Sequence, residues 1–406
     1  MYRKYWLFFL SFICTVFIAS AQKNGCKIKL QVANIQCETL YMTGFYGDEI
    51  KVVDSAKVKK NTAFFHVKKN LPDGLYVVVD ADKKVYAEWV LEKNRNFSVS
   101  MLVPNAAEQQ IVGSPENVAY HEYQKSKLYL SEQECTAYVH NMVAHNPQSL
   151  VSKYMLLEMR IHIDTMDQRL LYHPEFDKYA MEQLEGADTN RIAAFFHTYP
   201  LTTEIGRYYM KKLLFVYNVD GNPAYMDAFL YLYDHKYKNC GLQLLSDSYE
   251  RVVKRSAERK RRWLVGAEVP EIKAYDTEGH IQSTRDIHRS YIVLWFWDPD
   301  CEDCMIETPL LRDYYINNAD KYDFEVYASS ITEDVQRWRK TVETLGLNWI
   351  NTDFYAGEPN YDYIEYFNLL TTPASLLISE DHKIILRQFS LEELDNFLKN
   401  NSHLEE

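Results

Sequence analysis

The chain has little positive charge, little cysteine and few long apolar runs. Its 45 lysines and arginines are outnumbered by 57 aspartates and glutamates, which gives a net charge of −12. This balance argues against nucleic acid or anionic membranes as partners, because both are bound by a basic surface that displaces counterions. Beyond residue 21 no apolar segment is long enough to cross a bilayer. We therefore expect no nucleic acid, no transmembrane span in the mature chain, and a protein or small molecule as the partner.

Cysteine is too sparse for a disulfide scaffold. The chain has 7 cysteines in 406 residues, so its folds must be held by hydrophobic cores. Cys26 and Cys37 bracket a short predicted strand, and the sequence leaves open whether they pair or are two unpaired core residues. Cys135 and Cys240 are expected to pack as small hydrophobic side chains.

Residues 1–21 are typical of a secretory signal peptide. Arg3 and Lys4 supply the charged start, residues 7–18 the apolar stretch, and Ala19-Ser20-Ala21 a cleavage site of small residues. An uncleaved membrane anchor is the alternative, and it is disfavoured because the apolar stretch is shorter than the roughly 20 residues that span a bilayer. We predict an exported protein of the periplasm or cell envelope of a Gram-negative bacterium, where disulfides can form.

The composition is that of a globular, multidomain protein. Hydrophobic residues make up 47% and charged residues 25% of the chain, and its length exceeds that of one ordinary domain. After the signal peptide we predict a multidomain α+β protein. It has an antiparallel β domain over 26–113, an all-α domain over 115–262, and an α/β domain with a mixed sheet over 263–406.

The first domain is predicted from alternating apolar and polar residues, with Asp73-Gly74 and Asn94 at turns. The alternation covers residues 27–32, 40–42, 63–67, 75–79 and 96–100. A small antiparallel sandwich accounts for this pattern. Its aromatic residues need no ligand to explain them, because strands favour aromatic side chains.

The second domain begins after Gly113-Ser114-Pro115, where apolar residues change to helical spacing. Its prolines fall between the predicted helices, at 147, 174, 200 and 223. Its histidines are scattered without the close pairing of a helix-borne metal site, so we predict no metal. The basic run from Lys254 to Arg262 fits a solvated last helical turn, whose cations lie at the negative end of the helix dipole, and marks the boundary. A surface that recognises an acidic partner is the alternative.

The order of elements in the third domain is diagnostic. A hairpin surrounds Asp276–Gly279, followed by a uniformly apolar strand over 291–297 that runs directly into Cys301-Glu302-Asp303-Cys304. A uniformly apolar strand is expected at the centre of a sheet covered by helices on both faces. Further strands are predicted at 324–329, 374–378 and 383–386, and helices over 301–315, over 333–345 and from residue 391.

The two cysteines are spaced for redox exchange. Cys301 opens a predicted helix, where free backbone N–H groups and the helix dipole stabilise a thiolate, so we expect it to be the exposed nucleophile. Cys304, one turn further along the helix, is the shielded thiol that resolves the mixed disulfide. An inert disulfide or half of a zinc site are the alternatives, and no second Cys or His pair is spaced to complete a zinc tetrahedron.

Residues from about 265 to 402 resemble the thioredoxin-fold domain of exported TlpA/ResA-like thiol–disulfide oxidoreductases. The resemblance rests on Val265–Pro270 as the entry segment, Trp295–Cys301 as the strand into the active site, Pro309 as a helix kink, and Thr372-Pro373 as the cis-proline loop. The upstream segments resemble two uncharacterised modules found ahead of such domains in exported bacterial proteins. The resemblance implies an enzyme whose only redox group is the Cys301–Cys304 disulfide, with no bound cofactor.

The resemblance also implies roles for residues around the dithiol. Glu307 matches a buried acid that handles protons, and one helical turn places it on the same face as Cys304. Thioredoxin itself has a buried aspartate six residues before the first cysteine, where this chain has Trp295, so Glu307 is expected to be the only nearby base. An ordinary exposed glutamate is the alternative.

The loop around Pro373 and the end of the preceding strand are the predicted substrate contacts. Pro373 is expected to be cis and to lie against Cys301, where the neighbouring backbone pairs with an incoming peptide as an added strand. Thr372 would present its backbone to that peptide, and Trp297 would pack beside the dithiol. A trans loop proline and a tryptophan that belongs only to the core are the alternatives.

The charge between the cysteines predicts the direction of exchange. Glu302 and Asp303 lie between them and Asp298 and Asp300 just before, and negative charge there opposes a thiolate. We therefore expect a dithiol that reduces client proteins carrying disulfides or thiols, supplied by a membrane or periplasmic electron donor.

Two other functions remain open at this point. A peroxidase of the peroxiredoxin type shares much of this fold. Peroxiredoxins share a threonine three residues before the reactive cysteine, and this chain has Asp298 at that position. A cell-envelope scaffold with an ancillary thioredoxin-like domain is the third candidate, because the two upstream domains offer no chemistry.

Overall fold

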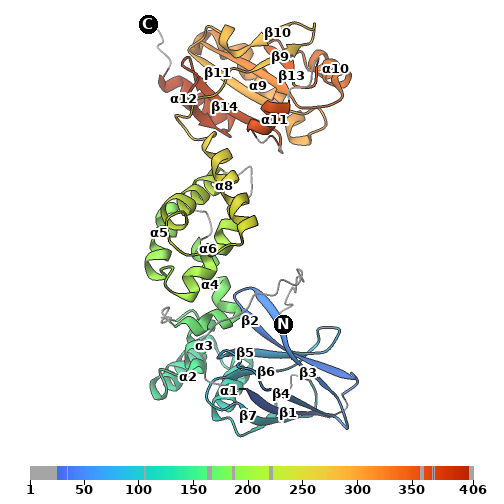
Figure 1. Cartoon of the computed structure of the whole chain (residues 1–406), viewed down its shortest axis with the longest axis vertical. Helices are drawn as coiled ribbons and strands as arrows, with labels where there is room; N and C mark the ends of the chain where they lie inside the picture. The colour runs from blue at the N-terminus through green and yellow to red at the C-terminus, as the bar shows by residue number, and fades with distance from the viewer. Residues whose placement is uncertain are drawn as a thin grey trace. The chain divides into compact units, whose positions relative to one another are not determined.

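The computed structural model describes residues 25–33, 35–104, 107–161, 167–184, 188–218, 223–356, 361–367, 369 and 371–401 (Figure 1). The predicted signal peptide lies outside this part of the chain. The chain divides into two compact units, residues 1–182 and 183–406. The helical segment expected as one domain, 115–262, is thus divided between them. Within the described ranges, no helix is both long and apolar enough to cross a membrane.

The described strands of the first unit form a sandwich of two sheets, with strand orders β4-β1-β7-β8 and β3-β2-β5-β6. The strands are β1 (Cys26–Val32), β2 (Thr39–Tyr46), β3 (Glu49–Lys57), β4 (Thr62–Val67), β5 (Gly74–Val79), β6 (Val85–Leu91), β7 (Asn96–Met101) and β8 (Gln109–Val112). Side chains of both sheets meet in one core around Phe65, Trp89 and Phe97. Cys26 is buried in this core and Cys37 packs against it, both as free thiols.

The sandwich differs from the predicted antiparallel domain in one pairing and three strands. β1 and β7 run parallel, because the chain passes through the second sheet before it returns beside β1. The sequence analysis did not predict β3, β6 and β8. β3 is mostly exposed on both faces and β6 mostly buried on both, so neither shows the alternation of a half-buried strand.

Helices α1 (Pro115–Tyr129), α2 (Glu132–His145) and α3 (Leu150–Glu158) complete the first unit with the 3-10 helix η1 (Gln168–Tyr172). They pack with the sandwich for a specific reason. The Asn117 side chain accepts a hydrogen bond from the Val90 N–H at 2.7 Å and donates one to the Val90 carbonyl at 2.8 Å. One side chain of α1 thus pairs with both backbone groups of a residue of β6 and holds the helix against the sandwich.

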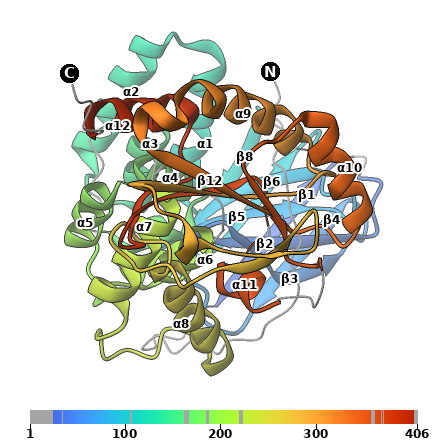
Figure 2. The same ribbon diagram turned by 90° about the horizontal axis from the view of Figure 1, so that it is seen from above.

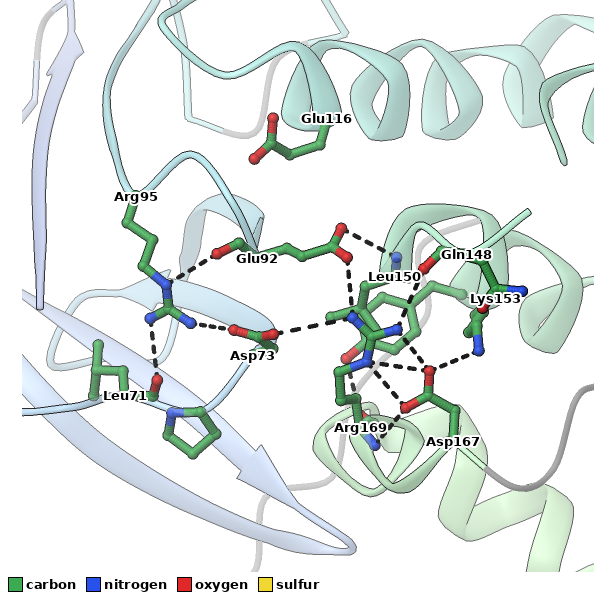
Figure 3. A network of polar contacts seen from close by, with 12 residues as sticks. Leu71, Asp73, Glu92, Arg95, Glu116, Gln148, Leu150, Lys153, Asp167 and Arg169 are labelled. Atoms are coloured by element: carbon green, nitrogen blue, oxygen red, sulfur yellow. Dashed lines mark hydrogen bonds and ion pairs between the residues drawn. The ribbon is translucent and has the colours of Figure 1, made fainter. Parts of the chain in front are cut away.

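Arg169 is at the centre of a buried polar network in the same unit (Figure 3). Its guanidinium contacts Glu92 Oε1 at 3.0 Å and Asp167 Oδ2 at 2.7 Å, and Lys153 Nζ lies 2.8 Å from Asp167 Oδ2. Burial alone would raise the pKa of Asp167, but hydrogen bonds from Arg169 and Lys153 hold that pKa well below its ordinary value. The network ties η1 and α3 to the end of β6 through paired charges.

The helices of the second unit follow α4 (Pro174–Leu184), which spans the division between the units. They are α5 (Thr189–Thr198), α6 (Glu204–Val216), α7 (Pro223–Tyr231), the π-helical segment η2 (Leu232–Tyr237) and α8 (Asp247–Arg261). Pro174 and Pro223 open helices, as the proline pattern predicts.

The basic run ends α8 as expected, but it is not a solvated turn. Lys260 is buried with its ammonium 5.6 Å from the centre of the Phe229 ring, and Arg261 pairs with Asp234. Arg262 donates to the Tyr366 carbonyl at 3.2 Å and the Trp263 indole to the Phe367 carbonyl at 3.0 Å. The predicted boundary is therefore a packed junction within the second unit.

The described strands of the second unit form one mixed sheet in the order β10-β9-β13-β12-β11-β14-β15. They are β9 (Lys273–Asp276), β10 (Ile281–Ser283), β11 (Tyr291–Trp297), β12 (Phe324–Ser330), β13 (Ile350–Asp353), β14 (Ala374–Ser379) and β15 (Ile384–Arg387). β11 pairs in parallel with β12 and antiparallel with β14. β11 is thus the central strand that its apolar sequence predicts.

Helices cover both faces of this sheet. α9 (Glu302–Tyr322), α10 (Val335–Leu345) and α12 (Leu391–Asn401) lie on one face, and α11 (Tyr361–Phe367) lies on the other (Figure 2). β13 and α11 are additions to the predicted element order. β13 escapes prediction because its buried residues include an asparagine, a threonine and an aspartate, which read as a loop.

Candidate active site at the start of α9

The dithiol lies where the central strand meets the N-terminus of α9. β11 ends at Trp297, and the chain turns through Asp298 to Cys301, which is the N-cap residue of α9. The Cys301 sulfur accepts a hydrogen bond from the Cys304 N–H at 3.2 Å. A helix N-terminus has unpaired N–H groups and the positive end of the dipole, so the position favours negative charge on this sulfur.

The two sulfurs differ in exposure. Cys301 is partly exposed, whereas Cys304 is completely buried, and both are free thiols in this structure. Burial, followed by a hydrogen bond with Cys301, raises the pKa of Cys304 to about 12. Cys304 is therefore a protonated thiol at neutral pH, and it must lose its proton before it can attack a disulfide.

The loop before β14 lies against both cysteines. The Thr372–Pro373 peptide is cis, as the sequence predicts. The register that pairs Phe296 with Ala374 brings this loop to the end of β11, and Cys301 Sγ donates a hydrogen bond to the Thr372 carbonyl at 3.2 Å. A hydrogen bond of the Thr372 side chain lowers the pKa of Cys304 in part. Thr372, predicted only as a backbone contact for the client, thus contacts the dithiol itself.

Glu307 is not the buried acid that the resemblance implies. Its side chain is exposed, one turn after Cys304 on α9. Partial desolvation, followed by the negative charge of Asp303, raises its pKa, although the carboxyl remains open to solvent. The helix puts Glu307 near the dithiol along the chain, but no packed element covers it in the way that Cys304 is covered.

Trp297 belongs to the core rather than to the surface. It is fully buried and shares one hydrophobic cluster with Cys304, so it packs beside the dithiol but is closed to a substrate. Among the described residues no hydrogen-bond partner faces its indole N–H. The expectation of a substrate contact is wrong because the Trp297 side chain is 0% exposed and packs in the core between the sheet and helices α9, α10 and α12.

Comparison with known families agrees with this geometry. Residues 289–384 match the family model described as Thioredoxin-like, and this segment contains both cysteines and the cis-proline loop. The C-terminal unit contains a thioredoxin-like domain. Residues 26–120 match a domain of unknown function (DUF4369), so the first of the two modules expected ahead of the thioredoxin-like domain is also a recognised one.

Two solved structures are similar to about a third of the chain. A domain of a possible thiol-disulfide isomerase from Cytophaga hutchinsonii is 28% identical, with 34% of this chain and 92% of that chain covered and a TM-score of 0.32. The thioredoxin domain of a thiol-disulfide oxidoreductase from Bacteroides vulgatus is 24% identical, with 34% and 99% covered and a TM-score of 0.32. The comparison with curated proteins found no match.

One polar residue of the thioredoxin-like domain has no place in the sequence prediction. Asp353 ends β13 at the same edge of the sheet as the dithiol, and its side chain is 1% exposed. The sequence does carry a signal: an aspartate follows Ile350, Asn351 and Thr352 at the end of a short strand. That signal is readable only once the strand is known to lie beside β12.

Proposed function

We propose that this protein is an exported thiol–disulfide oxidoreductase that reduces disulfides of client proteins through Cys301 and Cys304. The observation that carries the proposal is the asymmetric pair of cysteines. The partly exposed Cys301 sulfur at the helix N-cap accepts the Cys304 N–H and donates to the Thr372 carbonyl of the cis-proline loop, while the Cys304 thiol is buried. This arrangement separates a nucleophile that a client reaches from a resolving thiol that it does not.

The exchange proceeds in two steps. The Cys301 thiolate attacks one sulfur of a client disulfide, so that a mixed disulfide forms and the other client sulfur leaves as a thiolate. Cys304 then loses its proton and attacks Cys301, which forms the Cys301–Cys304 disulfide and releases the second client sulfur. The client gains two electrons, and the protein dithiol loses two.

The surface around the dithiol supports a protein as the client. Met305, Ile306 and Leu310 are exposed apolar side chains on the first turns of α9, with exposed fractions of 36%, 59% and 55%. Exposed apolar side chains that gather next to a reactive group are typical of a protein contact surface. The backbone around Thr372 would pair with an extended client segment on the other side of Cys301.

The direction of exchange is proposed from charge. Glu302 and Asp303 are exposed between the two cysteines, where their charge opposes a thiolate and favours the disulfide in the protein. Redox titration of the full-length protein against glutathione tests this. We expect a potential more reducing than that of the glutathione couple, and a potential as oxidising as that of a dedicated disulfide-forming enzyme would contradict a reducing role.

Insulin reduction by dithiothreitol tests the activity. The wild-type protein should accelerate precipitation of the insulin B chain, and Cys301→Ser should abolish the acceleration. Cys240→Ser is the matched control, because Cys240 is a partly exposed free thiol of the same unit outside the site. Equal rates for the wild type and Cys301→Ser would favour the scaffold function instead.

Cys304→Ser should hold clients as mixed disulfides, because the second attack is lost while Cys301 stays reactive. Identification of these clients by mass spectrometry after non-reducing purification defines the substrate class.

Cell fractionation tests export. We expect to find the chain in the periplasm or cell envelope, without residues 1–21. A membrane or periplasmic electron donor would supply it with electrons there.

A further inference from the structure

The end of α8 caps the end of α11, the short helix that leads into the cis-proline loop. Arg262 donates a hydrogen bond to the Tyr366 carbonyl at 3.2 Å, and the Trp263 indole N–H donates one to the Phe367 carbonyl at 3.0 Å. The last carbonyl groups of a helix have no partner within that helix, so they need donors from elsewhere. Two consecutive residues of another segment supply these donors to the last two residues of α11.

Ring contacts strengthen the same cap. The Arg262 guanidinium lies 4.5 Å from the centre of the Tyr366 ring, which is the geometry of a cation–π contact. The Trp263 ring meets the Phe367 ring edge to face, with 6.0 Å between their centres. Phe367 is buried, and Trp263 packs against the core cluster that contains it. Each residue of the cap therefore makes both a hydrogen bond and a ring contact with α11.

From α11 the contacts reach the dithiol by two routes. Along the chain, Thr372 follows Phe367 by five residues, and its carbonyl accepts the hydrogen bond of Cys301 Sγ at 3.2 Å. Through the core, the centres of the Phe367 and Phe296 rings are 5.0 Å apart, and Phe296 pairs with Ala374, the residue after the cis-proline. A displacement of α11 would therefore displace the loop that faces Cys301.

The rest of the junction is held independently of this cap. The Gly266 N–H donates to the Ile384 carbonyl at 2.8 Å and the Ile384 N–H to the Ala267 carbonyl at 3.0 Å, so the entry segment pairs with β15. Arg387 of β15 also donates to the Asp227 carboxylate of α7 at 2.7 Å. Removal of the two donors at α11 would therefore leave the helices that end with α8 attached to the thioredoxin-like domain.

We infer that Arg262 and Trp263 hold the cis-proline loop in place through α11 and thereby raise the affinity of the dithiol site for an extended client segment. The inference rests on the proposed function, because the loop is the surface with which the client backbone pairs. A loop that is already held in place loses less conformational entropy when a client binds. Both are positioning residues, which act through α11 and not on the sulfurs. They give the end of the helical segment a part in client binding.

The full-length protein with Trp263→Phe and Arg262→Met tests the inference. Phenylalanine keeps an aromatic ring without the indole N–H, and methionine keeps an apolar stem without the guanidinium. Arg261→Met is the matched control, because Arg261 is the preceding residue of α8 and pairs with Asp234 of η2. It removes the same kind of side chain from the same helix end and leaves the cap of α11 intact.

Hydrogen exchange of backbone amides, measured by mass spectrometry, reports on the loop without any activity. In the double variant, peptides that contain residues 371–376 should exchange at least about fivefold faster than in the wild type, because their local opening is easier. Peptides from β11 and β12 should exchange at the wild-type rate, which shows that the sheet stays folded. Arg261→Met should match the wild type in all of these peptides.

Insulin reduction at a series of insulin concentrations measures client binding. In the double variant KM should rise about fivefold while kcat stays within about twofold, because the client is bound less tightly and the dithiol keeps its chemistry. Reaction of Cys301 with 5,5′-dithiobis(2-nitrobenzoate), a small disulfide without a backbone to pair, should stay within about twofold of the wild type after subtraction of the Cys301→Ser rate. Arg262→Lys, which keeps a cationic donor beside an intact Trp263, should have a KM close to that of the wild type.

Faster exchange of the loop together with a raised KM supports the inference. Unchanged exchange at residues 371–376, or a lower kcat at an unchanged KM, overturns it. If β11 also exchanges faster, the double variant has loosened the whole sheet, and Trp263→Phe alone, which keeps the ring in place, then decides by the same two measurements. If the wild type reduces insulin no faster than Cys301→Ser, the proposed function itself fails, whatever the exchange of the loop shows.

Discussion

The acids around Arg169 are largely buried and the acid at the end of β13 is fully buried, but their pKa values shift in opposite directions. Asp167 lies between Arg169 and Lys153, and those cations hold its pKa well below the ordinary value although burial pushes it up (Figure 3). Asp353 has a serine, backbone N–H groups and the negative charge of Asp298 beside it, and within the described part of the chain no cation pairs with it. Burial dominates there, and its pKa rises.

The difference teaches how to separate structural from functional buried charge. A buried carboxylate paired with cations stays ionised at every physiological pH, so it can hold elements together but cannot exchange a proton. A buried carboxyl without a cation partner titrates near neutral pH and lowers the free energy of unfolding when it is ionised. Such groups are frequent at sites where a proton must move. The first unit contains both kinds, because burial and the negative charge of Glu158 raise the pKa of Glu88 on β6 to about 7. The thioredoxin-like domain contains the second kind in Asp353.

The largest effect is expected from Arg169→Met, which leaves Asp167 and Glu92 short of a partner. Removing one side of a fully buried ion pair costs about 3–5 kcal/mol, and because Arg169 is 29% exposed and Lys153 stays on Asp167, we expect a loss near the lower end of that range. Urea unfolding followed by hydrogen exchange of amides in β5 and β6 measures the loss. Lys51→Met is the control, because the Lys51–Glu49 pair is exposed and should contribute less than about 1 kcal/mol.

The pH dependence checks the sign of that contribution. Because the pKa of Asp167 is lowered in the folded chain, its stabilisation is present above the unfolded value of about 4 and is lost as the pH falls below it. The difference in the free energy of unfolding between the wild type and Arg169→Met should therefore become smaller as the pH falls. A difference that becomes larger toward low pH would show that the network is not the source of the stability.

Asp353→Asn should have the opposite sign and make the thioredoxin-like domain more stable. A carboxyl whose pKa rises to about 6 stabilises the fold while it is protonated, and that stabilisation is lost as the pH rises through 6. By pH 8 the penalty is about 3 kcal/mol, which the amide avoids, whereas near pH 4 the two proteins should be equal. Denaturant unfolding at both pH values measures this. Lower stability at pH 8 would mean that the carboxylate is paired after all.

Asp298→Asn should have a smaller effect, which is confined to the pKa of Asp353. Removing the neighbouring negative charge favours ionised Asp353, so its titration midpoint should shift to lower pH by less than about one pH unit. An NMR titration of the Asp353 carboxyl carbon across pH 4 to 8 resolves such a shift. A shift to higher pH would place the relevant charge elsewhere.

Glu307→Gln should have the smallest effect, because its carboxyl is exposed and solvent screens its charge. We expect insulin reduction within about twofold of the wild type. A tenfold loss would restore Glu307 as the base.

Much of the C-terminal fold could be read from local pattern. The apolar run of β11, the cysteines at the next helix start and the cis Thr372–Pro373 peptide are features of contiguous residues, and each occurs where the sequence predicts it. β13 and β6 could not be read in this way. Their character depends on which neighbours cover them, and four residues that include three polar ones show no period.

Sequence alone determined the dithiol and its place at a helix N-terminus, because spacing along the chain controls which groups one helical turn brings together. The loop that faces the dithiol was predicted only from the resemblance to the thioredoxin fold. Only the tertiary structure decided which of two acids is buried. Glu307 is three residues from Cys304 and lies in solvent, whereas Asp353 is about fifty residues away and buried at the end of β13. Burial and the absence of a paired cation set the behaviour of a carboxyl, and both come from strands that meet only when the sheet forms.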